Sequence, residues 1–301
     1  MILGIGEILF DQYPEGNRLG GAPFNFAAHL KALGLPVTFV SRVGVDEEGD
    51  AILDALVRRG FDPGMIQRDP RHDTGRVTVT LDDDGIPQFT IVSDVAYDHL
   101  AYSDAVAAAL AQGPDMIYYG TLIQRSHAAS ATVMKILENR SPSTRCFCDL
   151  NLRKGCYSQN SITRSLVHCD ILKLSDGELS ILKDLFNVRA ADKLFIDDLM
   201  HNFAITWVSL TSGVMGSTLF TRNDVFFADP DEQDAVVDTV GAGDGYAAIL
   251  AAGCLLGWQP ARILQRAARF AGALCRIPGA IPEDSEFYRP FLGWMNDGGE
   301  R

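Results

Sequence analysis

A loop of small residues at positions 238–248, with the sequence DTVGAGDGYAA, carries the residues best suited to chemistry. The apolar residues that follow predict a helix, and the free N–H groups at the start of a helix attract anions. Such amides could stabilise the charge on a phosphoryl group during its transfer. They belong to Gly241, Ala242, Gly243 and Asp244. The same residues would also suit an ordinary turn between a strand and a helix.

The carboxylate of Asp244 would repel a bound phosphate, but it could accept the proton of a hydroxyl group that attacks one. An aspartate with an ordinary pKa of about 3.9 is a weak base, which suffices when the proton leaves late in the reaction. The loop lacks the Gly-Lys-Ser/Thr of a Walker A motif and lies too late in the chain for a dinucleotide fingerprint. The residues therefore point to phosphoryl transfer onto an alcohol.

A second stretch, GGAPFNFAAHLKALG at positions 20–34, begins with paired glycines and continues as an amphipathic helix. Gly20 and Gly21 would let a ligand approach the backbone closely. Asn25 offers both a donor and an acceptor, which suits a sugar hydroxyl group.

These two stretches resemble the N-terminal and C-terminal signatures of the ribokinase-like (PfkB) carbohydrate kinases, in the same order and at the same ends of the chain. One departure is Ile249, where the family usually has a small residue. The resemblance covers essentially the whole chain. It implies transfer of the γ-phosphate of MgATP to a sugar hydroxyl group, with Asp244 as the base and the loop amides as the anion hole.

The resemblance also implies further contacts to the sugar. Asp11 should accept hydrogen bonds from two sugar hydroxyl groups, although a solvated acid at the end of the first strand is the alternative. Asn151 and Arg153 lie in DLNLR, which resembles the DPNxR of fructokinases. They should contact the sugar or the phosphate, unless they simply form a polar loop. GTLIQRS at positions 120–126 also resembles a fructokinase sequence.

The nucleotide contacts are likewise implied by the resemblance. KLSDGE at positions 173–178 resembles the region in which a glutamate, here Glu178, orders hydrated Mg²⁺, although a plain capping box predicts the same residues. TSGVMG at positions 211–216 resembles the loop that holds the ATP phosphates. The expected nucleotide-binding residues are Lys173, Ser175, Glu178, Thr211, Ser212, Gly213 and Gly216. Adenine should lie near residues 270–278, and a K⁺ ion beside the GAGD loop is compatible with the family.

Strands and helices must alternate to position these residues. The pattern predicts strands at 2–10, 37–43, 76–81, 88–92, 115–119, 145–150, 170–174 and 205–211, and helices at 22–33, 47–59, 126–138, 175–185, 242–256, 260–275 and 287–295. We expect an α/β fold, a doubly wound and mostly parallel sheet flanked by helices. Residues 76–92 alternate polar and apolar side chains, which predicts a β-hairpin with one solvent-exposed face and a turn at 82–85. We expect one domain over residues 1–301, with a small β-sheet lid from about 12–20 and 74–95.

Composition limits the remaining function classes. The net charge of the 301 residues is −13, which argues against a nucleic-acid partner. The longest apolar run is too short to cross a membrane, and the N-terminus lacks the features of a signal peptide. Six cysteines form no CxxC, and the six histidines show no metal-ligand spacing. We expect a cytoplasmic protein with reduced cysteines.

The combined prediction is a fructokinase that forms a homodimer through its lid. A kinase for 2-keto-3-deoxygluconate or another sugar is the alternative within the family. A sugar-binding regulator without turnover is the alternative outside the enzymes.

Overall fold

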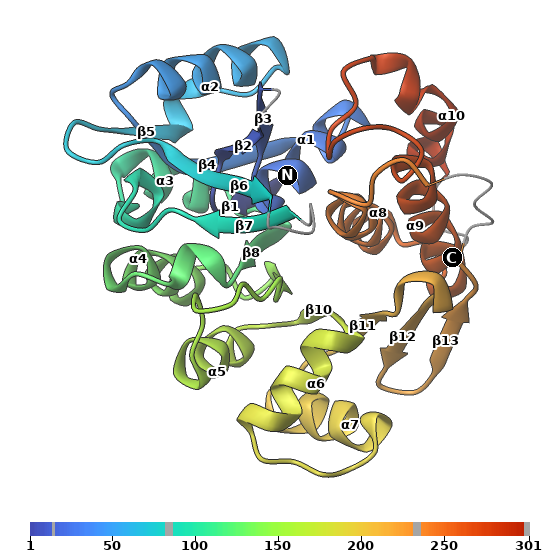
Figure 1. The fold of residues 1–301 in the computed structure, drawn as a ribbon. Helices are drawn as coiled ribbons and strands as arrows, with labels where there is room; N and C mark the ends of the chain where they lie inside the picture. Colours follow the sequence, from blue (N-terminus) through green and yellow to red (C-terminus); the bar gives the residue numbers. More distant parts are fainter. Residues whose placement is uncertain (14–15, 82–86, 231–235, 298–301) are drawn as a thin grey trace.

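The computed structural model describes residues 1–13, 16–81, 87–230 and 236–297, and one large nine-stranded sheet dominates it (Figure 1). From β11 to β5 the neighbouring strands are parallel, whereas β12 and β13 extend the β11 edge in antiparallel fashion. In spatial order the strands are β13 (Val225–Ala228), β12 (Ser217–Thr221), β11 (Trp207–Thr211), β10 (Ile171–Ser175), β9 (Arg145–Asp149), β8 (Met116–Gly120), β1 (Ile2–Ile5), β4 (Val37–Gly44) and β5 (Ile66–Asp69).

Helices cover both faces of this sheet. Along β8 the side chains of Met116 and Tyr118 enter one hydrophobic cluster, and those of Ile117 and Tyr119 enter a second cluster on the other face. The first cluster is covered by α1 (Ala22–Ala32), α2 (Glu47–Arg58), α8 (Ala242–Leu256), α9 (Pro260–Leu274) and α10 (Arg289–Leu292). The second is covered by α3 (Asp104–Ala111), α4 (His127–Glu138), α5 (Gln159–Val167), α6 (Asp176–Leu185) and α7 (Asp192–Asn202). The predicted doubly wound fold is confirmed.

The strand order reverses between β1 and β8, because the chain builds outward from β1 through β4 and later outward from β8 through β9. In doubly wound sheets, ligands bind outside the carboxyl ends of the strands at such a switch point. The loops after β1, β8, β9 and β10 therefore lie where a site is expected.

A second, four-stranded sheet has the order β3-β2-β6-β7 and forms the predicted small β-sheet. Its strands are β2 (Leu9–Tyr13), β3 (Gly16–Gly20), β6 (Gly75–Leu81) and β7 (Pro87–Ile91). We call it the lid sheet; in Figure 1 it lies in front of β1 and β4. The predicted turn at 82–85 lies outside the described residues.

The prediction of one strand over residues 2–10 is wrong. The chain leaves the large sheet after Ile5 and enters the lid sheet at Leu9, so Asp11 lies on β2 and not at the end of β1. A Cβ atom at Gly6 would stand 2.2 Å from Cγ of Pro23, so the break passes tightly against the start of α1. The mostly apolar sequence on both sides of Glu7 concealed this break.

The last predicted helix, at 287–295, is replaced by three shorter segments. They are the 3₁₀ helix Ser285–Tyr288, α10 and the 3₁₀ helix Gly293–Asn296. Pro290 lies in the first turn of α10, where it lacks the amide needed to continue an earlier helix.

Candidate active site

Two cavities meet at the N-terminal end of α8. The first, which we call the polar cavity, has a volume of about 630 Å³ and lies between the lid sheet and the ends of β1, β9 and β10. Its charged lining residues are Glu7, Asp11, Arg153, Lys154, Lys173 and Asp244. The second, which we call the apolar cavity, has a volume of about 590 Å³ and lies between the β11–β12 hairpin and α9. Thr239 and Gly243 line both cavities.

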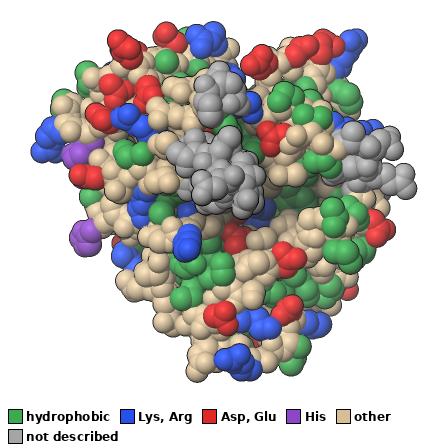
Figure 2. Space-filling model, viewed as in Figure 1, with side chains coloured by type: hydrophobic (Ala, Val, Ile, Leu, Met, Phe, Trp, Pro, Cys, Tyr) green, Lys and Arg blue, Asp and Glu red, His purple; other side chains and the backbone are tan. Residues whose placement is uncertain are grey.

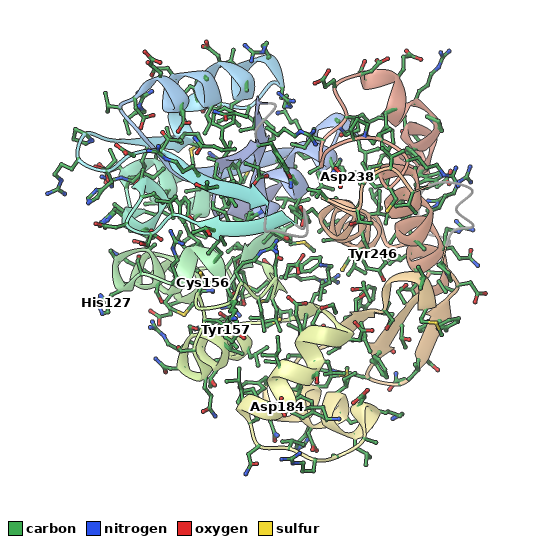
Figure 3. The ribbon with its side chains drawn as sticks, viewed as in Figure 1. His127, Cys156, Tyr157, Asp184, Asp238 and Tyr246 are labelled. Atoms are coloured by element: carbon green, nitrogen blue, oxygen red, sulfur yellow. The ribbon has the colours of Figure 1, made fainter. Side chains whose placement is uncertain are left out.

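The molecular surface is hollowed near the centre of this face, where acidic and basic side chains lie beside hydrophobic ones (Figure 2). Cys156, which lines the polar cavity, and Tyr246, which lines the apolar cavity, come from opposite sides of this opening (Figure 3).

The loop before α8 is held in a conformation that requires glycine at position 241. Gly241 has a φ of +78°, and a Cβ atom there would stand 2.4 Å from Cβ of Ala280, so only glycine fits. The carboxylate of Asp238 accepts hydrogen bonds from the amides of Val240 at 3.0 Å and Gly279 at 2.9 Å. These contacts fix the loop against the segment that follows α9.

The amides at the start of α8 are only partly used by the protein. The Ala242 amide donates to the carbonyl of Thr239 at 3.3 Å, and the Gly245 amide donates to that of Gly241 at 2.9 Å. The amides of Gly243 and Asp244 lie between them, among the first donors of the helix, which have no partner within the helix. They are the donors best placed for an anion at the junction of the two cavities.

Asp244 is buried and touches a residue from the other signature stretch. Its Oδ2 accepts a hydrogen bond from Nδ2 of Asn25 at 2.8 Å, while its side chain lines the polar cavity. Burial raises the pKa of Asp244 to about 6, although the Asn25 hydrogen bond opposes the shift. Asn25, predicted to bind the sugar, thus also orients the predicted base.

Lys173 lies close to Gly243 at the start of α8. Its Nζ donates to both carboxylate oxygens of Asp149 at 2.9 Å, and a Cβ atom at Gly243 would stand 3.5 Å from it. Both side chains are buried; although burial opposes the shift, the charge of Asp149 raises the pKa of Lys173. Lys173 lines the polar cavity and does not line the apolar one.

The polar cavity contains two further acids and two bases. Burial raises the pKa of Glu7 to about 7 and that of Asp11 to about 6, although Arg153 opposes both shifts. Glu7 is 4% exposed, and its Oε2 has no hydrogen-bond partner among the described residues. Glu7 and Lys154 were not predicted as site residues, because neither belongs to the sequence motifs of the family. A lone acid just after an apolar strand was the signal that could have identified Glu7.

The paired glycines allow close packing of the protein itself. A Cβ atom at Gly21, where φ is +109°, would stand 2.5 Å from the carbonyl oxygen of Glu7. A Cβ atom at Gly20 would stand 2.7 Å from Oδ2 of Asp11. Gly21 and Asn151 line the polar cavity, whereas Gly20 does not.

Glu178 is engaged by the protein through both carboxylate oxygens. Oε1 accepts from the amide of Leu152 at 2.6 Å, and Oε2 accepts from the amide of Ser175 at 2.7 Å. The Ser175 hydroxyl completes a capping box at the start of α6. Ser175 and Glu178 line neither cavity, so Glu178 would reach a bound metal only through water.

The β11–β12 hairpin and α9 form the walls of the apolar cavity. Thr211, Gly213 and Gly216 line it, whereas Ser212 does not; the Ser212 amide instead donates to the carbonyl of Gly216 at 2.9 Å. Opposite them, α9 and its end contribute Ala268, Ala271, Gly272 and Cys275. This wall lies in the region predicted to hold adenine.

A model of the pfkB family of carbohydrate kinases matches residues 15–286. The chain belongs to this family. Named relatives of this PfkB kinase include a fructokinase from Rhizobium leguminosarum bv. trifolii, 28% identical over 83% of this chain and 79% of the relative. Fructokinase-1 from Zea mays is 26% identical over 83% of this chain and 81% of the relative.

Solved structures of similar fold include two that contain ATP. An uncharacterized sugar kinase from Pyrococcus horikoshii in complex with ATP has a TM-score of 0.81 and 24% identity, with 98% of this chain and 99% of that chain covered. A fructokinase with bound ATP from Xylella fastidiosa has a TM-score of 0.81 and 21% identity, with 97% and 98% covered. The PfkB kinase described here is therefore a carbohydrate kinase with a ribokinase-like fold. No helix within its described residues has the length and apolar character required to cross a membrane.

Proposed function

We propose that the protein transfers the γ-phosphate of MgATP to the terminal hydroxymethyl group of fructose. The observation that carries this proposal is the junction of the two cavities at Thr239 and Gly243, directly beside Asp244. A nucleotide in the apolar cavity would present its terminal phosphate to a hydroxyl group held in the polar cavity.

In the proposed reaction, the sugar oxygen forms a bond to the γ-phosphorus while the bond to the bridging β,γ oxygen breaks. The hydroxyl proton passes to Asp244, and ADP leaves. With a pKa of about 6, Asp244 is ionised at neutral pH and is a stronger base than an exposed aspartate. The amides of Gly243 and Asp244 and the ammonium of Lys173 would stabilise the charge that spreads over the equatorial oxygens.

The apolar cavity suits a nucleotide because small residues of α9 leave an apolar wall with room for a base, and the β11–β12 hairpin supplies backbone groups for phosphates. Thr211, Gly213 and Gly216 are proposed to contact the phosphates, and Ser212 to shape their loop. Mg²⁺ would enter with ATP and keep several waters, one of which Glu178 would orient together with Ser175. A K⁺ ion beside the GAGD loop remains part of the proposal.

A neutral sugar fits the polar cavity better than a sugar acid. Glu7, Asp11 and Asp244 face it with three carboxyl groups, against Arg153 and Lys154; the third cation of the lining, Lys173, is paired with the buried Asp149. Carboxylates accept hydrogen bonds from hydroxyl groups but repel a substrate carboxylate. The fructokinase names among the relatives support fructose in particular. Arg153 and Lys154 could bind a substrate carboxylate, so 2-keto-3-deoxygluconate is retained as the alternative.

The lid sheet supplies Asp11 to the sugar and would exclude water when it closes. Arg18 on β3 lies 3.9 Å from Asp238 in the loop before α8, which links the lid sheet to the base-bearing loop. We extend the proposal to a cytoplasmic homodimer in which an edge strand of the lid sheet, β3 or β7, pairs with a second copy. Sedimentation of wild type at several concentrations tests the dimer.

The experiment that tests the function is ADP release from MgATP with a panel of fructose, glucose, ribose and 2-keto-3-deoxygluconate. We expect the highest kcat/KM with fructose and little ADP release without a sugar. A higher kcat/KM with the sugar acid would favour the alternative substrate. Equal, sugar-independent rates for wild type and Asp244→Asn would favour a regulator without turnover.

A further inference from the structure

Two histidines and an aspartate meet at the root of the lid sheet, away from both cavities. His72 lies between β5 and β6, Asp94 follows β7, and His99 ends the 3₁₀ helix Ala96–His99. One ligand atom from each side chain lies within 4.8 Å of the others. The cluster thus joins the segment that enters the β6–β7 pair to the segment that leaves it. The spacing of these histidines in the sequence gave no indication of a metal site.

The contacts within this cluster are specific. Nε2 of His99 lies 2.8 Å from Oδ1 of Asp94, and Nε2 of His72 lies 3.9 Å from the same oxygen. The two imidazole rings stack with centroids 3.5 Å apart and planes 11° apart. On the far side of its ring, Nδ1 of His72 lies 3.0 Å from Oδ2 of Asp69.

Asp69 holds His72 in one tautomer. Asp69 is 1% exposed, binds Arg42 at 2.7 Å and accepts a hydrogen bond from the amide of Arg71 at 2.9 Å. The Asp69 carboxylate accepts a hydrogen bond from Nδ1–H of His72, so in the neutral ring Nε2 carries the lone pair on the side of Asp94. A buried carboxylate behind a histidine is the usual support of a metal-binding imidazole.

A lone pair that faces a carboxylate oxygen calls for a cation between them, either a proton or a metal ion. We propose that His72 Nε2, His99 Nε2 and the Asp94 carboxylate bind a divalent transition-metal ion, with Zn²⁺ the best match, and that water completes the coordination. Two imidazoles and one carboxylate form a ligand set that Zn²⁺ accepts in tetrahedral geometry. Mg²⁺ prefers oxygen ligands, so this site differs in chemistry from that of MgATP.

The ion can reach the cluster and draw it together. The side chains of His72, His99 and Asp94 are 19%, 30% and 79% exposed. Bond lengths near 2.0–2.2 Å place the ligand atoms of a tetrahedral ion about 3.3 Å apart. The 3.9 Å separation of His72 and Asp94 would therefore shorten, the 2.8 Å separation of His99 and Asp94 would lengthen, and the two stacked rings would tilt so that both nitrogens face the ion. Because the ligands come from both sides of the β6–β7 pair, the bound ion would clamp the root of the lid sheet.

The test uses the full chain after dialysis against a chelator, without nucleotide or Mg²⁺. Zn²⁺ binding is measured by isothermal titration calorimetry, and Co²⁺ is added separately to record its absorption spectrum. We expect one equivalent of Zn²⁺ to bind and to raise Tm. His99→Ala and, separately, Asp94→Asn should each lower the affinity about 10- to 100-fold, by analogy with lost support of a metal site. His127→Ala, an exposed histidine at the start of α4 (Figure 3), should bind as wild type does.

Cys156→Ser distinguishes this site from adventitious thiol binding, because Cys156 is the one cysteine that is not buried. We expect unchanged Zn²⁺ affinity in this variant. The proposal is overturned if wild type binds no Zn²⁺, or if the His99 and Asp94 variants bind it as tightly as wild type does. Crystals grown with Zn²⁺ give an independent readout: an anomalous peak between the three side chains supports the site, and a peak elsewhere contradicts it.

Discussion

Asp244→Asn should abolish activity and at the same time stabilise the fold at neutral pH. The substitution keeps the size of the side chain but removes both the charge and the basic oxygen. A positioned general base contributes a factor of about 10²–10⁴ to the rate, and we expect kcat to decrease by a factor in that range. If the Asp244→Asn variant loses activity while its fold becomes more stable, the loss comes from the chemistry of Asp244 and not from damage to the structure.

The magnitude of the stabilisation follows from the pKa of Asp244. Burial raises it from 3.8 to about 6, and one unit corresponds to 1.36 kcal/mol, so ionisation costs the folded state about 3 kcal/mol well above pH 6. Because the folded pKa is the higher one, this penalty is absent below about pH 3.8 and grows as the pH rises through about 6. The free energy of unfolding of the variant should therefore exceed that of wild type by about 3 kcal/mol at pH 8 and by about half of that at pH 5.

Urea unfolding at pH 5 and pH 8 measures this difference, and coupled ADP release measures kcat. Asp184→Asn is the matched control, because Asp184 is an exposed carboxylate on α6 (Figure 3), and we expect it to leave kcat and the pH dependence of stability unchanged. The reasoning is refuted if Asp244→Asn retains kcat, or if its stability relative to wild type is the same at both pH values.

Three further substitutions test other parts of the site. Lys173→Met should destabilise the fold by about 3–5 kcal/mol in urea unfolding, because it leaves the buried Asp149 without its ion-pair partner; an unchanged midpoint would contradict this. Gly241→Ala should lower kcat and stability, because the new Cβ atom would stand 2.4 Å from Cβ of Ala280. Gly257→Ala is the control: Gly257 has a similar φ of +71° but open space around it, so this variant should keep the kcat of wild type. At pH 8, where Glu7 with its pKa of about 7 is mostly ionised, Glu7→Gln should raise the sugar KM about 10-fold or more, because a hydrogen bond to a charged group is lost. The KM for ATP should change little, and equal rises in both would argue against a sugar contact.

The sequence predicted the helices that flank the site because their apolar spacing and end signals are local. Helix α8 begins at Ala242 and ends at Leu256, the predicted bounds, and Gly257 follows with a φ of +71°. The break after Ile5 could not be predicted in the same way. The apolar residues on both sides of it belong to different sheets, and only strand pairing over long distances decides where one sheet ends.

Local sequence patterns also did not show which distant residues contact each other in the site. Lys173 and Asp149 occupy neighbouring strands in direct register, so their ion pair depends on sheet order. GTLIQRS at positions 120–126 is a local motif whose polar residues contact the protein itself. Gln124 donates to Gly120 and Ser165, and Arg125 binds Asp98, so this similarity to fructokinases reports packing more than sugar contact.

The most direct test of the central claim is a crystal structure of the wild-type protein with Mg²⁺, ADP, aluminium fluoride and fructose. We expect the fluoride group to lie on the amides of Gly243 and Asp244, with a sugar hydroxyl group about 2.6–3.2 Å from a carboxylate oxygen of Asp244. A fluoride group bound away from the start of α8, or a sugar whose nearest hydroxyl lies out of reach of Asp244, would contradict the account.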